Sequence, residues 1–339
     1  MLKVKQFSIL VLNSLFAVSF ANAAADKVAT ADELYQQAVI PYEQGWDKGL
    51  DLMWQAANAG STKALCTIAS GYQGTSLIVN ADAQKYFKKA AELGGFCGML
   101  ALSNIGENVM LDSTLAEHQS DGGWSDKLIK KSKQLAEEGD IGGLKTYSFI
   151  LSLKNDDNGA CKWLEKAAQK GDAGAQFNLA NDIRSGCGWY LIPGSRDKAV
   201  RHWIEQAANN GNPRAMDQLA VYYQEAGDIK SMLHWYGMGA NIGNVNSILF
   251  YSGYLMSALE LGVEVPLELQ DKVKSYGLLN AVVSQITEDD NVFSAYHQAI
   301  ERMRFLEKEL TTKELDEAKK WSNEWMKTHQ VRNYSLEFN

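Results

Sequence analysis

Apolar residues recur along this chain at helical spacing, and the same arrangement returns. The arrangement starts with a small residue. Leu-Ala follows four residues after it, and a large apolar residue stands three positions after that second Ala, so that all of them lie on one face of a helix. It is carried by Ala175, Leu179, Ala180 and Ile183, and again by Ala215, Leu219, Ala220 and Tyr223. Strand-like alternation is hard to find, and the chain has only four prolines. The pattern predicts an all-α fold.

A second pattern accompanies these helices: a pair of small residues followed three residues later by glycine. It occurs as Ala56-Ala57 with Gly60, Ala90-Ala91 with Gly94, Leu135-Ala136 with Gly139, Ala167-Ala168 with Gly171, Ala207-Ala208 with Gly211, and Gly239-Ala240 with Gly243. Eight residues before each glycine stands Leu52, Tyr86, Lys131, Trp163, Trp203 or Trp235. This is an internal repeat of two helices per unit, in which Lys131 is the outlier.

Each part of the repeat has a structural reason. Large residues of one helix need small residues opposite them if two backbones are to approach closely, so the tryptophans are expected to pack against the small pairs. Gly171 follows the last turn of a second helix, where a left-handed residue ends the helix. Asp172 then caps the next helix. The repeated segment therefore ends one helix, makes a tight turn and begins the next helix. A stack of the resulting helix pairs is a helical solenoid.

The order KAAxxG, preceded by an aromatic residue and followed by AxxxLAxxY, resembles the Sel-1-like repeat family, relatives of the tetratricopeptide repeats. The resemblance runs from about Tyr35 to Tyr254. It implies a right-handed superhelix of about six to seven helix pairs. We expect the solenoid to span residues 24–260, and a degenerate repeat with C-terminal capping helices to span 261–339.

Two units are longer than the others because they carry insertions between their helices, over residues 107–123 and 188–195. We expect both loops to project from the same end of the stack, which is often the working face. Near the C-terminus, Thr311 and Glu314 form a capping box. The helix that it opens has an apolar stripe at Leu315, Ala318, Trp321 or Ser322, and Trp325. This helix is predicted to seal the end of the solenoid.

The first residues have the order of a secretory signal peptide over 1–23. Two lysines are followed by an apolar run from Phe7 to Phe20 and by Ala21-Asn22-Ala23. We expect cleavage after Ala23 and a periplasmic or secreted protein. The run is short for a bilayer-spanning helix, which needs ~20 residues, and no later run is long enough, so membrane insertion is not expected. Loss of both lysines makes the chain more acidic than its formal net charge of −8, which argues against a nucleic-acid partner.

Four cysteines in an oxidising compartment indicate two disulfides. Cys66 and Cys97 lie near the starts of first helices in consecutive units, and Cys161 and Cys187 lie near helix–helix turns in consecutive units. Bridged Cα atoms must lie within ~7 Å, so we favour Cys66–Cys97 and Cys161–Cys187 over the other two connectivities. Free buried thiols remain the alternative.

Signs of catalytic or metal chemistry are weak, and no cofactor is predicted. The histidines show no HExxH spacing, and no two cysteines are separated by two residues. His202 and His234 each precede the Trp of a repeat and are expected to be exposed. Ser195 and Lys198 match the SxxK pattern of penicillin-recognising enzymes, but the second Ser/Asp/Asn element and a Lys-Thr-Gly strand are missing. Ser195 is better explained as the N-cap of the helix that carries Trp203.

The resemblance also implies a binding surface. In the tetratricopeptide relatives, first helices line a concave groove, and positions two before and two after the Leu of the repeat face into it. On this chain these positions are Lys145, Phe149, Phe177, Asn181, Asp217, Val221, Leu249 and Gly253, extended by Arg184 and Gln224. Such a lining suits a protein or peptide partner. Packing of the superhelix is the alternative role for its aromatic and aliphatic members.

Two classes of function stay open. The first is a non-catalytic scaffold or adaptor of the periplasm or cell envelope. Its sharper version is an immunity protein that covers a secreted lipase-type toxin, as several periplasmic members of the resembled family do. The second is a penicillin-recognising or peptidoglycan-related hydrolase, which the missing elements disfavour. We favour the first class, and the sequence predicts no particular oligomeric state.

Overall fold

The computed structural model describes residues 29–74, 80–103, 105, 123–288 and 294–336. Within them the protein is all-α, and apart from two 3-10 turns and one isolated bridge between Asn244 and Arg332 it consists of α-helices and their connections. In chain order the helices are α1 (Ala31–Gln44), α2 (Trp46–Asn58), α3 (Thr62–Gln73), α4 (Ala81–Glu92), α5 (Phe96–Ala101), α6 (Gly123–Glu137), α7 (Ile141–Leu153), α8 (Asp157–Gln169), α9 (Ala173–Ser185), α10 (Ser195–Asn209), α11 (Pro213–Glu225), α12 (Ile229–Asn241), α13 (Val245–Leu255), α14 (Lys272–Gln285), α15 (Ala295–Glu309) and α16 (Thr312–Trp325). The expected signal peptide and most of the insertion over 107–123 lie outside the described residues.

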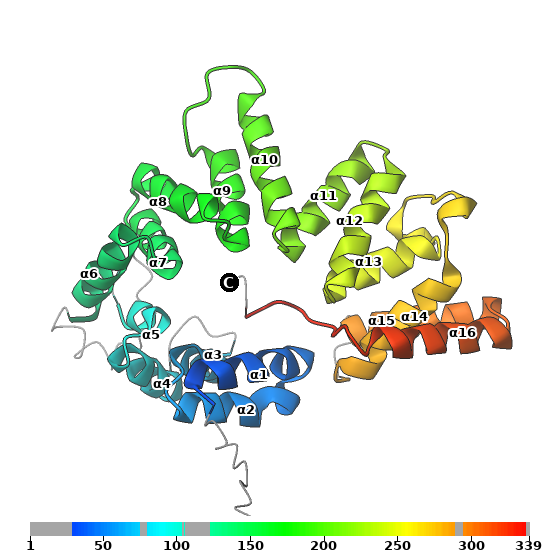
Figure 1. The fold of residues 1–339 in the computed structure, drawn as a ribbon, viewed down its shortest axis with the longest axis horizontal. Coiled ribbons are helices and arrows are strands. Elements are labelled where there is room, and N and C mark those ends of the chain that lie inside the picture. Colours follow the sequence, from blue (N-terminus) through cyan, green and yellow to red (C-terminus); the bar gives the residue numbers. More distant parts are fainter. Residues whose placement is uncertain (1–28, 75–79, 104, 106–122, 289–293, 337–339) are drawn as a thin grey trace, which may run out of the picture.

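The helices stack as consecutive pairs along a curved path (Figure 1). Seven pairs run from α1/α2 to α13/α14, and α15 and α16 pack onto the last of them. Helices α1, α3 and α7 lie nearer the centre of the curve than their partners α2, α4 and α8 (Figure 1). The predicted all-α solenoid of six to seven helix pairs with a helical cap is therefore confirmed.

The repeated glycines end helices as predicted. Gly171 has φ +89°, and its amide donates to the Ala168 carbonyl while the Asp172 amide donates to the Ala167 carbonyl. The Asp172 carboxylate then accepts the Ala175 amide at 2.6 Å and caps α9. The other glycines of the repeat also have positive φ: Gly60, Gly94, Gly139, Gly211 and Gly243.

The small pairs form the contact layer between helices. Ala167 and Ala168 are 0% and 1% exposed. The repeat tryptophans Trp163, Trp203 and Trp235 pack against the same core cluster but remain half-buried. Each indole therefore packs against the core and stays partly accessible to water, so the predicted packing is confirmed with less burial than a core residue has.

Lys131, the outlier of the repeat, has a role of its own. Its ammonium donates to the carbonyl of Gly94 at 2.6 Å, just after the end of α4. It also lies 5.5 Å from the centroid of the Phe96 ring. A cation is favourable at a helix C-terminus, where carbonyls lack intrahelical partners. The lysine thus joins two units where the other units use a bulky apolar side chain.

Both favoured disulfides are present. Cys66 in α3 is bridged to Cys97 in α5 with a Cα–Cα distance of 6.3 Å, and Cys161 in α8 is bridged to Cys187 after α9 at 6.1 Å. Each bridge joins neighbouring units. No helix in the described part of the chain is both long and apolar enough to cross a bilayer.

The C-terminal cap has the predicted helix. Thr311 and Glu314 make both hydrogen bonds of a capping box at the start of α16. Ala318 and Ser322 are fully buried, and Leu315, Trp321 and Trp325 pack against the core cluster beneath them. The helix covers α14, as a cap should.

The end of the stack is not left open, however, because the first and last units meet. The Gln44 carbonyl at the end of α1 accepts the Thr287 amide at 2.8 Å, just after α14. The Lys48 ammonium donates to the Gln285 carbonyl at 2.6 Å. The solenoid therefore closes on itself, which the sequence analysis did not predict.

Residues 330–336, here called the C-terminal strap, hold this closure. The strap leaves α16 and crosses the opening between α13 and α1 (Figure 1). The Arg332 amide donates to Gly243, and the Val245 amide donates to Arg332, both at 2.8 Å. The Arg332 guanidinium donates to Glu43 of α1 at 2.9 Å, where the Glu43 side chain is 0% exposed. The strap therefore connects the α12–α13 turn to α1.

Candidate protein-interaction surfaces

Several residues predicted to line the groove make contacts between neighbouring units. The Lys145 ammonium of α7 lies 3.3 Å from the carboxylate of Asp172, the N-cap of α9. The Arg184 guanidinium of α9 faces the amide oxygen of Gln218 on α11, in the amide orientation that satisfies both groups. These contacts run from one first helix to the next, so they set the spacing between units.

The polar links continue from α11 to α13. The Gln224 amide oxygen accepts the Tyr254 hydroxyl at 2.8 Å. The Asp217 carboxylate accepts the Ser247 hydroxyl at 2.5 Å. Burial raises the pKa of Asp217 to about 6, and the hydrogen bond from Ser247 opposes that shift. Asp217 is thus a mostly buried carboxyl that joins two repeats, rather than a free charge in a groove.

The apolar members of the predicted groove differ in exposure. Phe149 on α7 and Val221 on α11 are 49% and 43% exposed. Phe177 is half-buried and packs against the core cluster of its unit, and Asn181 is also half-buried. Phe149 and Val221 are therefore the predicted apolar groove residues that are most accessible to a partner.

Leu249 is not available to a partner. It is 7% exposed and belongs to the core cluster around α13 and α14. Arg302 of α15 donates to its carbonyl and also lies beside Gly253, where a Cβ would meet the guanidinium at 3.1 Å. The expectation that these two positions line an open groove is wrong, because α15 covers them.

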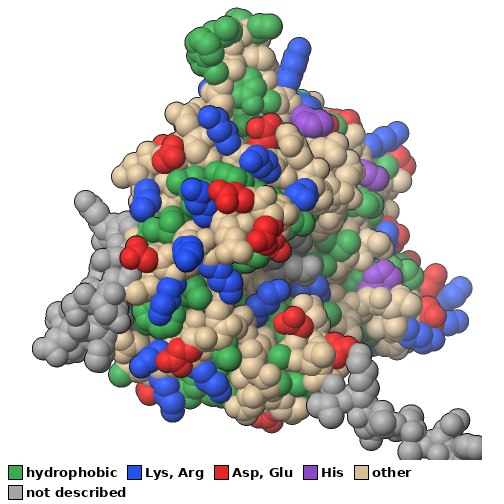
Figure 2. All heavy atoms as spheres, turned by 60° about the vertical axis from the view of Figure 1, so that its left-hand side comes forward, with side chains coloured by type: hydrophobic (Ala, Val, Ile, Leu, Met, Phe, Trp, Pro, Cys, Tyr) green, Lys and Arg blue, Asp and Glu red, His purple; other side chains and the backbone are tan. Residues whose placement is uncertain are grey.

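The insertion between α9 and α10 forms a second surface. The loop over 188–195 projects from the ring at the top of Figure 1 and stands clear of the body as an apolar knob in Figure 2. Trp189 is 88% exposed, Leu191 74% and Ile192 73%. These three side chains are here called the apolar tip. They are the most exposed large apolar residues described except for Leu267.

The base of this loop is firmly held. Cys187 is bridged to Cys161 of α8. The Arg196 guanidinium donates to the carbonyls of Ile183 and Cys187, and it lies 5.0 Å from the centroid of the Tyr190 ring. A disulfide and a cation therefore fix the loop from both sides, so the tip is presented on a rigid support.

The SxxK motif lies at the foot of the same loop. The N-cap of α10 is Gly194, and Ser195 is the first residue of the helix, so the predicted N-cap role of Ser195 is wrong by one position. The Ser195 hydroxyl donates to the Ile192 carbonyl at 2.6 Å. In the described part of the chain it makes no hydrogen bond to Lys198. Its hydroxyl closes the turn of the loop.

His202 and His234 are exposed on second helices, as expected, and each ring lies edge-on to the following Trp. Among the described residues, no group of three or more His, Cys, Asp or Glu side chains could hold a metal ion. The face in Figure 2 carries Lys and Arg interspersed with Asp and Glu, so the net acidity of the chain is not concentrated there.

No protein-family model matches the chain, and no curated protein matches it. Among solved structures, a protective antigen of uropathogenic Escherichia coli strains, described as displaying an SLR fold, is similar over 89% of this chain at 18% identity and a TM-score of 0.43. This chain covers 62% of that antigen. A Sel1 repeat protein from Oxalobacter formigenes is similar over 88% of this chain and 86% of its own, at 19% identity and a TM-score of 0.41. These likenesses concern the fold alone, and the solenoid assignment rests on the helices and repeats of the chain itself.

Proposed function

We propose that this chain is an exported member of the Sel-1-like repeat family that acts as a non-catalytic protein-interaction scaffold in the periplasm or cell envelope. The repeated KAAxxG phrases support the family, and two disulfides fit an oxidising compartment. The partner is a protein with an apolar pocket or cleft. The exposed groove residues Phe149 and Val221 supply a second, smaller contact.

The apolar tip is the observation that carries this proposal. Soluble proteins seldom expose large contiguous apolar patches, and those that occur often mark binding sites. Tryptophan is enriched among the residues that dominate binding energy. Because Cys187 and Arg196 already hold the loop, little conformational entropy is lost when a partner binds. Trp189 is accordingly expected to be the anchor of the interface.

A protein pocket suits this tip better than a lipid surface. Even one myristoyl chain gives only marginal membrane binding, and stable anchoring takes a second signal beside an apolar group. A snug pocket gains packing as well as desolvation, so the same three side chains bind more tightly there.

The finer version of the proposal is an immunity role against a secreted lipase-type toxin. Such an enzyme takes apolar substrates through an apolar entrance, and a rigid apolar tip is a suitable shape to cover it. Purified chain should then inhibit the hydrolysis of a short-chain ester by the toxin encoded beside it, at a 1:1 ratio. Substitution of Trp189 by Ser should weaken this inhibition at least tenfold.

The scaffold role itself is tested with the mature chain as immobilised bait in envelope extract. A Trp189→Ser/Leu191→Ser variant removes the tip, and Leu267→Ser is the matched control, because Leu267 is 82% exposed on a different loop. The proposal requires a protein that is retained by wild type and by the control and is lost by the tip variant. That protein, once purified, should bind wild type directly in calorimetry. Retention unaffected by the tip variant, or binding of wild type to phosphatidylcholine vesicles alone, would refute the proposed role of the tip.

A further inference from the structure

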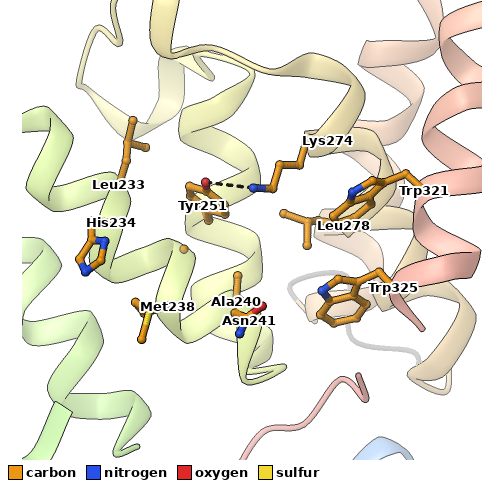
Figure 3. Close-up of a pocket in the computed structure, with 11 residues that line it drawn as sticks. Leu233, His234, Met238, Ala240, Asn241, Tyr251, Lys274, Leu278, Trp321 and Trp325 are labelled. Carbon is orange, nitrogen blue, oxygen red and sulfur yellow. Dashed lines mark hydrogen bonds between the residues drawn. The ribbon is translucent and has the colours of Figure 1, made fainter. Parts of the chain in front are cut away.

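A pocket of about 340 Å³ lies between α12 and the C-terminal cap (Figure 3). Its walls come from the consecutive helices α12, α13 and α14 and from α16 of the cap. The side chains that matter below are Met238 of α12, Tyr251 of α13, Lys274 and Leu278 of α14, and Trp321 and Trp325 of α16. It shares no residue with the apolar tip or with the predicted groove, so its role is independent of the function proposed above.

Two glycines allow the aromatic side chains Tyr251 and Trp321 to pack closely against neighbouring helices. A Cβ at Gly237 would lie 3.2 Å from the Tyr251 ring, and a Cβ at Gly277 would lie 2.6 Å from the Trp321 ring. Both rings therefore rest directly on a helix backbone. A side chain at either position would push the ring away, so the two glycines help to fix where Tyr251 and Trp321 stand in the pocket wall.

One cation stands among these apolar walls. The Lys274 ammonium lies 3.4 Å from the Tyr251 hydroxyl and 5.1 Å from the centroid of the Tyr251 ring. Figure 3 shows the Lys274 side chain extending from α14 toward Tyr251, with Leu278 and the two indoles of α16 on its other side. No carboxylate of the described residues forms an ion pair with it, whereas Lys272 on the same helix pairs with Glu309. Lys274 is half-buried, and an ammonium whose contacts in the described residues are these two with Tyr251 favours an anionic ligand.

We propose that this pocket binds an apolar carboxylate, a molecule in which an aromatic or aliphatic group lies next to one carboxyl group. The apolar group packs against Trp325, Met238 and Leu278, and the carboxylate accepts from the Lys274 ammonium. A single cation among indoles and aliphatic side chains fits one carboxylate better than a phosphate with two charges. The same chemistry occurs in a free acid and in the last residue of a protein chain, and the experiment distinguishes the two.

The test uses the whole mature chain labelled with ¹⁵N and follows the indole N–H signals of Trp321 and Trp325, assigned with Trp→Phe variants. The probes are N-acetyl-phenylalanine, which carries the carboxylate, and N-acetyl-phenylalanine amide, which is neutral and otherwise alike. The acid should shift both indole signals and bind about tenfold more tightly than the amide, because one charge-assisted hydrogen bond separates them. Absence of shifts with the acid, or equal binding of acid and amide, would overturn the proposal.

Two lysine variants then assign the charge. Lys274→Met keeps the aliphatic stem and should abolish the preference for the acid. Lys272→Met makes the same change on the same helix, outside the pocket, and should leave the preference unchanged. A preference that survives in Lys274→Met would contradict the role of this lysine. If that variant does not fold, the comparison of acid and amide on wild type still decides the proposal.

An octapeptide that ends in phenylalanine identifies the source of the ligand. Binding at least tenfold tighter than N-acetyl-phenylalanine, lost on amidation of the peptide, assigns the pocket to the C-terminus of a protein chain. Equal binding of peptide and small acid assigns it to a free acid. Both outcomes support the apolar carboxylate, and binding of the amidated peptide as tightly as the free peptide refutes it.

Discussion

The ion pair between Arg332 of the C-terminal strap and Glu43 of α1 should be a main support of the ring closure. The variant Arg332→Ala removes the guanidinium but keeps the main-chain hydrogen bonds of residue 332 with Gly243 and Val245. It leaves the Glu43 carboxylate, which is 0% exposed, without its cation. The cost therefore reports on the Arg332 side chain, which also lies 4.2 Å from the centroid of the Tyr334 ring, and not on the whole strap.

The magnitude follows from the burial of the pair. Removing one partner of a buried ion pair costs about 3–5 kcal/mol. Two features place this pair at the lower end. The Arg332 side chain is 15% exposed, and the Leu336 amide continues to donate to Glu43 at 3.2 Å. We expect the free energy of unfolding to fall by about 3 kcal/mol, and part of that loss should be recovered in Glu43→Gln/Arg332→Ala, where no charge is left unpaired.

Two measurements check this prediction. Urea titration followed by circular dichroism gives the free energy of unfolding, with Arg304→Ala on α15 as the matched control, because Arg304 is exposed. Hydrogen exchange should show the Val245 amide, which donates to the strap, exchanging about 100-fold faster in Arg332→Ala, since each 1.4 kcal/mol is a factor of ten. A loss of stability no larger than that of Arg304→Ala, with unchanged exchange at Val245, would refute the reasoning.

Three further predictions follow from single sites. Burial raises the pKa of Asp217 to about 6 from its usual 3.8, so the folded state binds this proton more tightly than the unfolded state. This group should therefore stabilise the protein by about 2–3 kcal/mol as pH falls from 7 to below 4, and Asp217→Asn should remove that slope from urea titrations at several pH values. Cys161→Ser/Cys187→Ser should cost about 2–4 kcal/mol and increase hydrogen exchange in the 188–195 loop; unchanged exchange there would show that the bridge does not hold the tip. Gly171→Ala should lower the free energy of unfolding, measured by urea titration, by about 1–2 kcal/mol. The reason is that φ at residue 171 is +89°, although no atom lies within 4 Å of the new Cβ. An unchanged free energy of unfolding would mean that the turn relaxes.

Features that depend on neighbouring residues in the chain could be predicted from the sequence. Gly171 ends one helix and Asp172 caps the next one, so the boundaries of the helix pairs could be predicted without coordinates. Once the repeat was in register, residues at equivalent heights in adjacent units had to be close. That reasoning gave both disulfides, including Cys66–Cys97.

Features that depend on contacts between distant units, or on the exact offset between adjacent ones, could not be predicted. Arg332 and Glu43 are 289 positions apart, and neither belongs to a motif. Leu249 has the spacing of a groove residue, but α15 returns over it, and no local pattern reveals that return. Lys145 has the position of a groove residue too, yet its contact with Asp172 depends on the exact offset between two units. Helical spacing identifies the face of a helix, whereas tertiary packing decides what covers that face.

The closure also restricts how this protein can change during evolution. An open array tolerates duplication or loss of a unit, because each unit contacts only its neighbours. Here one helix pair more or fewer would shift Gln44 away from Thr287 by about the thickness of a helix layer, 8–10 Å, and break the main-chain hydrogen bond between them. The copy number of the units is therefore fixed by geometry, and new length is tolerated only in excursions such as residues 188–195.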